Sequence, residues 1–255
     1  MIEQFVCLSG LPRSGSTLLS AILSQNPLIH AEGNSAVCQM MWDTYQSCTI
    51  NAKEQLTANG KQSIVGDFIK QIPEVYYTNK SKTETIIVDK CRSWTIPTNI
   101  EILRKFIDAN IKIIVLERSV LEIVASFVKL YTENNVDSIS LQKRVLEPTS
   151  DPIMRSIAGL QWAKQNNQTN TFIFINYNEL VNETEATIAK IYNFCGWAPF
   201  THDFNNVTIK YPENDEVYGI KGQHEIRPFI KQRQYVVTLT KETIDTCLGL
   251  MSAIH

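Results

Sequence analysis

The chain has 255 residues, of which 44% are hydrophobic and 20% are charged. This composition is typical of globular proteins and excludes a disordered, collagen-like or coiled-coil chain. The 24 lysines and arginines stand against 26 aspartates and glutamates, so the net charge is −2. A general binder of nucleic acid or of anionic membranes would need a basic surplus, and we expect neither function. No apolar run reaches the roughly 18 residues of a membrane span.

Other global features favour one cytoplasmic domain. No repeat, low-complexity tract or Pro/Gly-rich linker divides the sequence, so we expect a single domain over residues 1–255. The six cysteines are scattered without a CxxC pair, which is typical of buried, reduced thiols. The N-terminus lacks the basic and apolar segments of a signal peptide. The oligomeric state stays open, a homo-oligomer included.

Short apolar runs alternate with segments of helical periodicity along the chain. The runs that predict strands are residues 4–9, 85–89, 111–117 and 171–176. Helices are predicted over residues 16–25, 100–109, 120–131 and 183–195, the first ended by Asn26-Pro27 and the last by Gly196. Such alternation predicts a three-layer α/β fold with a central, mostly parallel sheet flanked by helices. The polar segments 132–152 and 200–232 are expected to be irregular and to supply binding loops.

The strongest motif lies between the first strand and the first helix and reads Gly10-Leu11-Pro12-Arg13-Ser14-Gly15-Ser16-Thr17. Backbone N–H groups of such a loop, together with the N-terminus of the next helix, attract a phosphate or sulfate. The spacing copies the nucleotide-binding P-loop, which makes the expected fold P-loop-like. However, Ser16 stands where the NTPase lysine would be, and Arg13 is the cation of the loop. The missing lysine disfavours a small-molecule kinase that uses ATP, which stays as an alternative.

A second motif lies where the strand 111–117 passes into its helix. Arg118 leaves the strand end, and Ser126 follows eight residues later, inside the helix. Carboxyl ends of parallel strands meet at one edge of a sheet, where ligands of open α/β sheets bind. Both side chains are therefore expected to reach the same cluster of ligand oxygens as the first loop.

Together these motifs resemble the sulfotransferases that use 3′-phosphoadenosine 5′-phosphosulfate (PAPS). The loop is similar to the family's 5′-phosphosulfate-binding loop, in the arginine form of tyrosylprotein and many bacterial members. Arg118 and Ser126 match the family's 3′-phosphate pair, including the spacing. The stretch from Phe174 to Val181 resembles the family's Tyr-x-x-Leu segment, which places Tyr177 near the adenine. The resemblance covers about residues 4 to 200.

The resemblance implies a donor site with specific residues. PAPS would be bound by Arg13, Ser14, Gly15, Ser16, Thr17, Arg118, Ser126 and Tyr177. Two departures stand out. Leu18 replaces the aromatic residue that stacks on adenine in cytosolic members, and their Gly- and Lys-rich loop near the C-terminus is not recognisable. The run 217–228 lies in its place and offers Lys221 and Arg227 as further cations.

Sulfuryl transfer needs in-line positioning and charge stabilisation, and we expect no metal. Arg13 would neutralise charge on the leaving oxygen, and Lys90 matches a supporting lysine of tyrosylprotein sulfotransferases. The histidine base of cytosolic members is absent from Lys90-Cys91-Arg92. Glu32 lies in the region of the glutamate base of tyrosylprotein members and is the favoured base, with His30 and His224 as alternatives.

The acceptor is the least defined part of the prediction. It is expected to be a small molecule or a saccharide with a hydroxyl or amine, entering past residues 33–82 and 132–165. Trp42, Tyr45, Tyr76 and Tyr77 are candidate wall aromatics. A third reading is a catalytically inactive nucleotide-binding protein that keeps the pocket without the chemistry.

Overall fold

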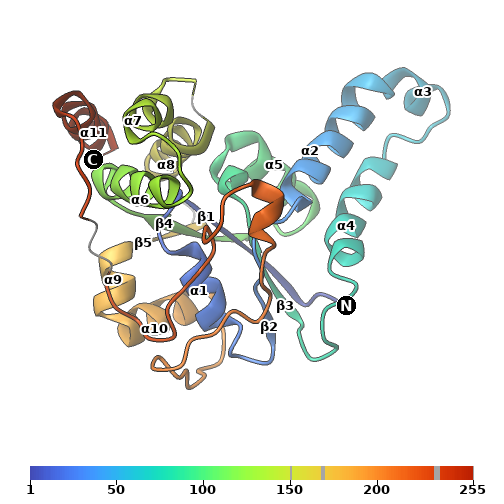
Figure 1. The fold of residues 1–255 in the computed structure, drawn as a ribbon. Coiled ribbons are helices and arrows are strands. Elements are labelled where there is room, and N and C mark those ends of the chain that lie inside the picture. Colours follow the sequence, from blue (N-terminus) through green and yellow to red (C-terminus); the bar gives the residue numbers. More distant parts are fainter. Residues whose placement is uncertain (150, 168–169, 233–235, 255) are drawn as a thin grey trace.

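The strands form one parallel sheet in a computed structural model that describes residues 1–149, 151–167, 170–232 and 236–254 (Figure 1). Within these residues the strands are β1 (Gln4–Gly10), β2 (Ile29–His30), β3 (Ile86–Lys90), β4 (Lys112–Glu117) and β5 (Phe172–Asn176). Their order is β2-β3-β1-β4-β5, with every neighbouring pair parallel. The predicted α/β fold is confirmed.

Helices cover both faces of the sheet because its strands bury alternate residues on opposite sides. Phe5 and Cys7 of β1 belong to one core, whereas Val6 and Leu8 belong to the other. The first core is completed by α2 (Val37–Gln46), α5 (Pro97–Phe106), α6 (Val120–Glu133) and α8 (Ser156–Gln165). The second is completed by α1 (Ser16–Leu23) and α10 (Thr184–Cys195). The result is a three-layer arrangement (Figure 1).

The remaining elements lie beside these helices, and several add buried residues to the two cores. They are η1 (Ser47–Asn51), α3 (Lys53–Ala58), α4 (Ile64–Tyr76), η2 (Arg92–Thr95), α7 (Ser138–Leu146), η3 (Asp151–Arg155), α9 (Tyr177–Asn182), η4 (Asp215–Tyr218) and α11 (Lys241–Ile254). Helices α2 and α4 pack against each other, and with η1 and α3 they form an arm that projects from the sheet (Figure 1). None of the helices in the described part of the chain is long and apolar enough to cross a bilayer.

The predicted strands and helices are all present, but two segments differ from expectation. The stretch 132–152 is not irregular, since it contains the end of α6 and the whole of α7. Asp137 caps α7 by accepting a hydrogen bond from the Ser140 N–H, and Leu141 and Val145 are buried in the first core. A short helix, α9, also precedes the predicted helix 183–195. The segment 200–232 is irregular apart from η4, as predicted.

Candidate functional site

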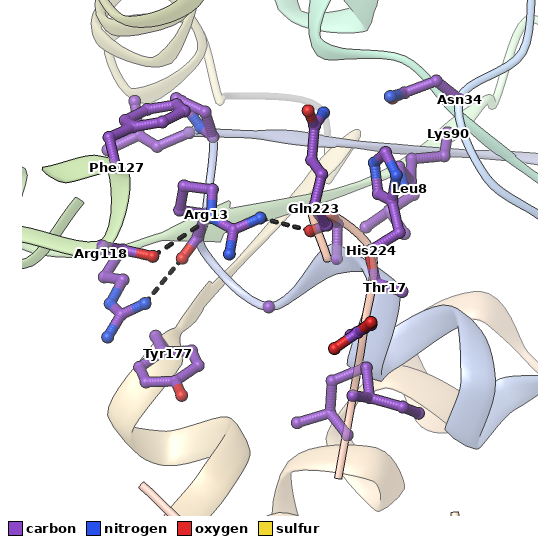
Figure 2. A pocket seen from close by; sticks show the side chains of 18 of the residues that line it. Leu8, Arg13, Thr17, Asn34, Lys90, Arg118, Phe127, Tyr177, Gln223 and His224 are labelled. Atoms are coloured by element: carbon purple, nitrogen blue, oxygen red, sulfur yellow. Dashed lines mark hydrogen bonds between the residues drawn. The ribbon is translucent and has the colours of Figure 1, made fainter. Parts of the chain in front are cut away.

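A cavity of about 420 Å³ opens at the carboxyl edge of the sheet. Its walls come from the loop after β1, the ends of β1 and β3, the residue after β4, the middle and second half of α6, and the segment 223–231 (Figure 2). Because all strands run the same way, residues that are far apart in the sequence meet at this edge. The cavity therefore lies where the sequence places its binding site.

The loop after β1 follows a path that two glycines make possible. Gly10 and Gly15 have φ angles of +128° and +96°, which residues with a side chain rarely adopt. A Cβ on Gly10 would lie 2.1 Å from the Leu116 carbonyl oxygen of β4, and one on Gly15 would lie 3.0 Å from the Tyr177 ring. Arg13, at φ 58°, also adopts the left-handed conformation. The loop is thus pressed against β4 and α9, with Arg13 at its crest.

Arg13, Ser126 and Arg118 meet on one wall of the cavity. The Arg13 Nε donates to the Ser126 Oγ at 3.1 Å, and its Nη1 donates to the Gln223 carbonyl at 2.5 Å. Arg118 donates from Nη1 to the Arg13 carbonyl at 2.8 Å (Figure 2). The two motifs that the sequence marked separately form one cluster.

The Arg118 side chain is 2% exposed and is held from two further sides. Its guanidinium lies 3.8 Å from the centre of the Tyr177 ring, a cation–π geometry. Its Nε donates to the Glu122 carboxylate at 3.1 Å, one helical turn along α6. These contacts fix the direction of the guanidinium, so Arg118 and Tyr177 enter the cavity wall as one unit.

Lys90, the last residue of β3, lies across the cavity and is buried. Its Nζ is 3.1 Å from the Glu213 Oε1. Burial lowers the pKa of Lys90, and the Glu213 carboxylate works in the opposite direction by favouring the ammonium. The cation expected at this strand end is therefore present, but it is paired with a carboxylate that the sequence did not mark.

Glu213 is bound in a space that Gly33 leaves open. A Cβ on Gly33 would lie 2.1 Å from the Glu213 carboxyl group. The Glu213 Oε1 accepts from the Asn34 N–H, and the Tyr218 hydroxyl donates to Oε2, both at 3.1 Å. The His224 Nε2 is 3.4 Å from the same Oε1. Glu213 lies in an irregular polar segment without a periodic sequence pattern, so only its contacts in the structure identify it as a site residue.

The candidate base Glu32 lines a smaller cavity of about 20 Å³ beside the main one. The two cavities share Thr17, Lys90 and His224. The Glu32 side chain is 28% exposed, and its Oε2 is 3.0 Å from the Nε2 of His30. His224, also on the main wall, has its Nδ1 2.6 Å from the Asp215 Oδ1. Both alternative histidines thus contact carboxylates.

Some of the predicted site residues line the main cavity, whereas others do not. Ser16, Thr17 and Arg227 line the main cavity as expected, but the Ser14 hydroxyl is buried and donates to the Leu11 carbonyl. Lys221, whose backbone pairs with Asn134, is not among the described residues of the wall. The candidate wall aromatics Trp42, Tyr45, Tyr76 and Tyr77 pack against the first core or lie within it. The aromatic residues of the described wall are Phe127, Tyr131, Tyr177 and Phe229.

Positive charge dominates the described wall. Arg13, Lys90, Arg92, Arg118, Arg227 and Lys231 line it. Such a wall suits an elongated ligand with negative groups at both ends. Among the described residues, no group of three or more His, Cys, Asp or Glu side chains could hold a metal ion.

Comparisons with known proteins identify a matching family and solved structures of similar fold. The model of the sulfotransferase family matches residues 6–202, whereas a search of curated proteins found no match. The sulfotransferase domain of the Synechococcus PCC 7002 olefin synthase has a TM-score of 0.55 and 18% identity, covering 97% of this chain and 94% of its own. The sulfotransferase domain from the curacin biosynthetic pathway has a TM-score of 0.56 and 18% identity, covering 98% of both chains.

A sulfotransferase from Alicyclobacillus acidocaldarius has a TM-score of 0.51 and 12% identity, covering 86% of this chain and 89% of its own. At these identities the solved structures show the shared fold, and the family model connects the sequence itself to the enzymes. Its match includes the loop after β1, Lys90, Arg118, Ser126 and Tyr177. The chain belongs to the sulfotransferase family.

Proposed function

We propose that this enzyme transfers the sulfuryl group of PAPS to a hydroxyl or amine of a small molecule or saccharide. One observation carries the proposal. The loop after β1 lacks the NTPase lysine, and its Arg13 contacts both Arg118 and Ser126 in a single cationic cavity. A nucleotide with phosphate groups at its 5′ and 3′ positions matches two such adjoining anion sites.

The donor would lie along the wall from the loop to α6. Backbone N–H groups of the loop, with the hydroxyls of Ser16 and Thr17, would hold the 5′-phosphosulfate. Arg118 and Ser126 would hold the 3′-phosphate, and Tyr177 would lie near the adenine. Arg227, on the facing segment, would add charge from the other side.

The transfer is an in-line displacement. The acceptor oxygen forms a bond to sulfur while the bond from sulfur to the bridging 5′-phosphate oxygen breaks. Arg13 would stabilise the negative charge that grows on that leaving oxygen, and Lys90 would bind the sulfuryl oxygens. The acceptor proton would pass to Glu32, which lies beside Lys90 and Thr17 in the adjoining cavity.

Donor binding tests the first half of the proposal. The desulfated donor, 3′-phosphoadenosine 5′-phosphate, should raise the melting temperature without magnesium and should do so more than adenosine 5′-phosphate. A larger stabilisation by ATP with magnesium would instead favour the alternative, a small-molecule kinase. That alternative already lacks the lysine that normally contacts the β- and γ-phosphates.

Transfer itself tests the second half. Labelled sulfate should move from PAPS to one member of a panel of phenols, alcohols, amines and sugars. With that acceptor, Glu32→Gln should lower kcat by about 10²- to 10⁴-fold, the usual contribution of a general base. Glu133→Gln, at an exposed position on α6, is the matched control. Donor binding without transfer to any acceptor would favour the inactive nucleotide-binding protein.

A further inference from the structure

His30 lies between two carboxylates at the end of the edge strand β2. It is 4% exposed, with Nδ1 3.0 Å from the Glu84 Oε2 and Nε2 3.0 Å from the Glu32 Oε2. A neutral imidazole has a single N–H and can donate to only one of them. When both carboxylates are ionised, both contacts are hydrogen bonds only if the ring is an imidazolium, so the geometry favours the charged form.

Glu84, on the Nδ1 side of His30, is held in its ionised form by its contacts. Glu84 is fully buried, and its Oε1 accepts from the Lys210 Nζ at 2.7 Å and from the Tyr211 hydroxyl. Its Oε2 also accepts from the Ser81 N–H at 2.9 Å. Burial raises the pKa of Glu84, but these hydrogen bonds outweigh it and lower the pKa to about 2. Glu84 therefore remains an anion and holds one side of His30.

Two tyrosine rings hold the imidazole in place. Ring centres lie 4.2 Å from His30 for Tyr211 and 5.2 Å for Tyr77. Burial lowers the pKa of His30, whereas the hydrogen bonds to Glu32 and Glu84 raise it, with a net rise above 6.5. The groups that face the imidazole are thus two carboxylates and two phenols, with Lys210 behind Glu84.

We propose that His30 is a positioning residue: anchored by Glu84, it holds one oxygen of Glu32 and directs the other toward the acceptor. The proposal rests on the proposed function, in which Glu32 is the base. The surroundings of Glu32 fit both parts of this role. His30 contacts its Oε2, and Glu32 lines a small cavity whose lining residues Thr17 and Lys90 also line the main cavity.

Loss of the His30 proton would undo this arrangement. The neutral ring keeps one N–H, and the buried anion Glu84 retains it, because Glu32 is 28% exposed and can bind water instead. The bare Nε2 then repels Glu32. Since the pKa of His30 is raised above 6.5, kcat should fall as the pH rises through that higher value.

Two substitutions separate the two contacts. The amide nitrogen of His30→Gln reaches about as far as Nε2 and can still donate to Glu32, whereas that of His30→Asn reaches about as far as Nδ1 and can donate only to Glu84. His30→Gln should keep most of kcat and lose the alkaline fall that His30 causes. His30→Asn should lose up to about 100-fold in kcat, the cost of a misplaced catalytic group. Binding of 3′-phosphoadenosine 5′-phosphate should be unchanged in both.

The enzyme also allows a readout that does not depend on activity. Nitrogen NMR of His30 should show both ring nitrogens protonated below pH 6.5, and Glu32→Gln should lower the pKa of His30. His202→Gln is the matched control, because this half-buried histidine contacts the Tyr192 hydroxyl and, among the described residues, pairs with no carboxylate. A His30 that is neutral below pH 6.5 would overturn the proposal.

The kinetic outcomes distinguish the two proposals. Equal losses of kcat in His30→Gln and His30→Asn, with the alkaline fall intact, would show that His30 is only structural. If Glu32→Gln were fully active, the base assignment under the proposed function would fail first. If Glu32→Gln were inactive while His30→Asn kept the wild-type kcat and pH profile, only the role of His30 would fail.

Discussion

Substitution of Arg118 offers the sharpest test of how this enzyme would recognise the 3′-phosphate of its donor. We expect Arg118→Ala to weaken binding of 3′-phosphoadenosine 5′-phosphate far more than binding of adenosine 5′-phosphate, which lacks the 3′-phosphate. The guanidinium is 2% exposed and is already fixed by Tyr177, Glu122 and the Arg13 carbonyl. Little side-chain entropy is therefore lost when the phosphate binds.

The size of the effect follows from that geometry. One hydrogen bond to a charged group contributes about 1.5–3 kcal/mol, and about 1.4 kcal/mol corresponds to a factor of ten in Kd. Arg118→Ala should therefore reduce the preference for the 3′-phosphate by roughly 10- to 150-fold. Arg118→Lys, which keeps the charge but loses the planar fork, should give an intermediate loss.

Isothermal titration calorimetry with both nucleotides gives the ratio of the two Kd values for each variant. Arg104→Ala is the control, because the Arg104 Nη2 donates to the Thr171 hydroxyl at the opposite end of the sheet. Melting temperatures measured without ligand show how much of each variant is folded. Equal weakening of both nucleotides by Arg118→Ala would refute the assignment and leave Arg118 as a support of the loop.

Three further predictions follow from single contacts. Gly10→Ala should lower the free energy of unfolding in urea by at least about 3 kcal/mol, because its Cβ would overlap the Leu116 carbonyl oxygen. The control Gly60→Ala, whose Cβ would have nothing within 4 Å, should lower it by about 1 kcal/mol, and equal losses would contradict the overlap. Lys90→Met should lower kcat while leaving the Kd of the desulfated donor within about threefold, and a change in Kd alone would place Lys90 at the nucleotide instead. The stability that the Glu84 carboxylate provides should be lost as the pH falls from 4.5 toward 2, because the pKa of Glu84 is lowered in the folded state. Glu84→Gln should lack this part of the acid unfolding transition. An unchanged transition would show that Glu84 is not ionised in the folded state.

Local sequence signals predicted the elements that depend on neighbouring residues alone. Apolar runs marked the long strands, and Gly196, at φ +72°, ends α10 as a C-cap should. The segment 132–152 was misread because α7 has polar residues on much of its surface, and its buried face packs against distant parts of the first core. Such packing is not visible within a window of ten residues.

The donor side of the candidate site was predictable for a similar reason. A glycine-rich turn between a strand and a helix, and an arginine at the next strand end, are each fixed by a few consecutive residues, and a parallel sheet brings their edges together. The Ser14 hydroxyl was expected to contact the donor, but whether a hydroxyl faces ligand or backbone depends on the path of the loop. In the structure it donates to the Leu11 carbonyl.

By itself, the sequence predicted the fold class, the glycine-rich loop after β1, and the meeting of Arg118 and Ser126 with this loop at one edge of the sheet. Only the tertiary structure decided which charges neighbour one another. Glu213 reaches Lys90 across 123 residues, and Glu84 reaches His30 across 54. No periodicity or spacing encodes contacts of this length, because they depend on how irregular segments lie against the sheet and bring opposite charges within a few ångströms.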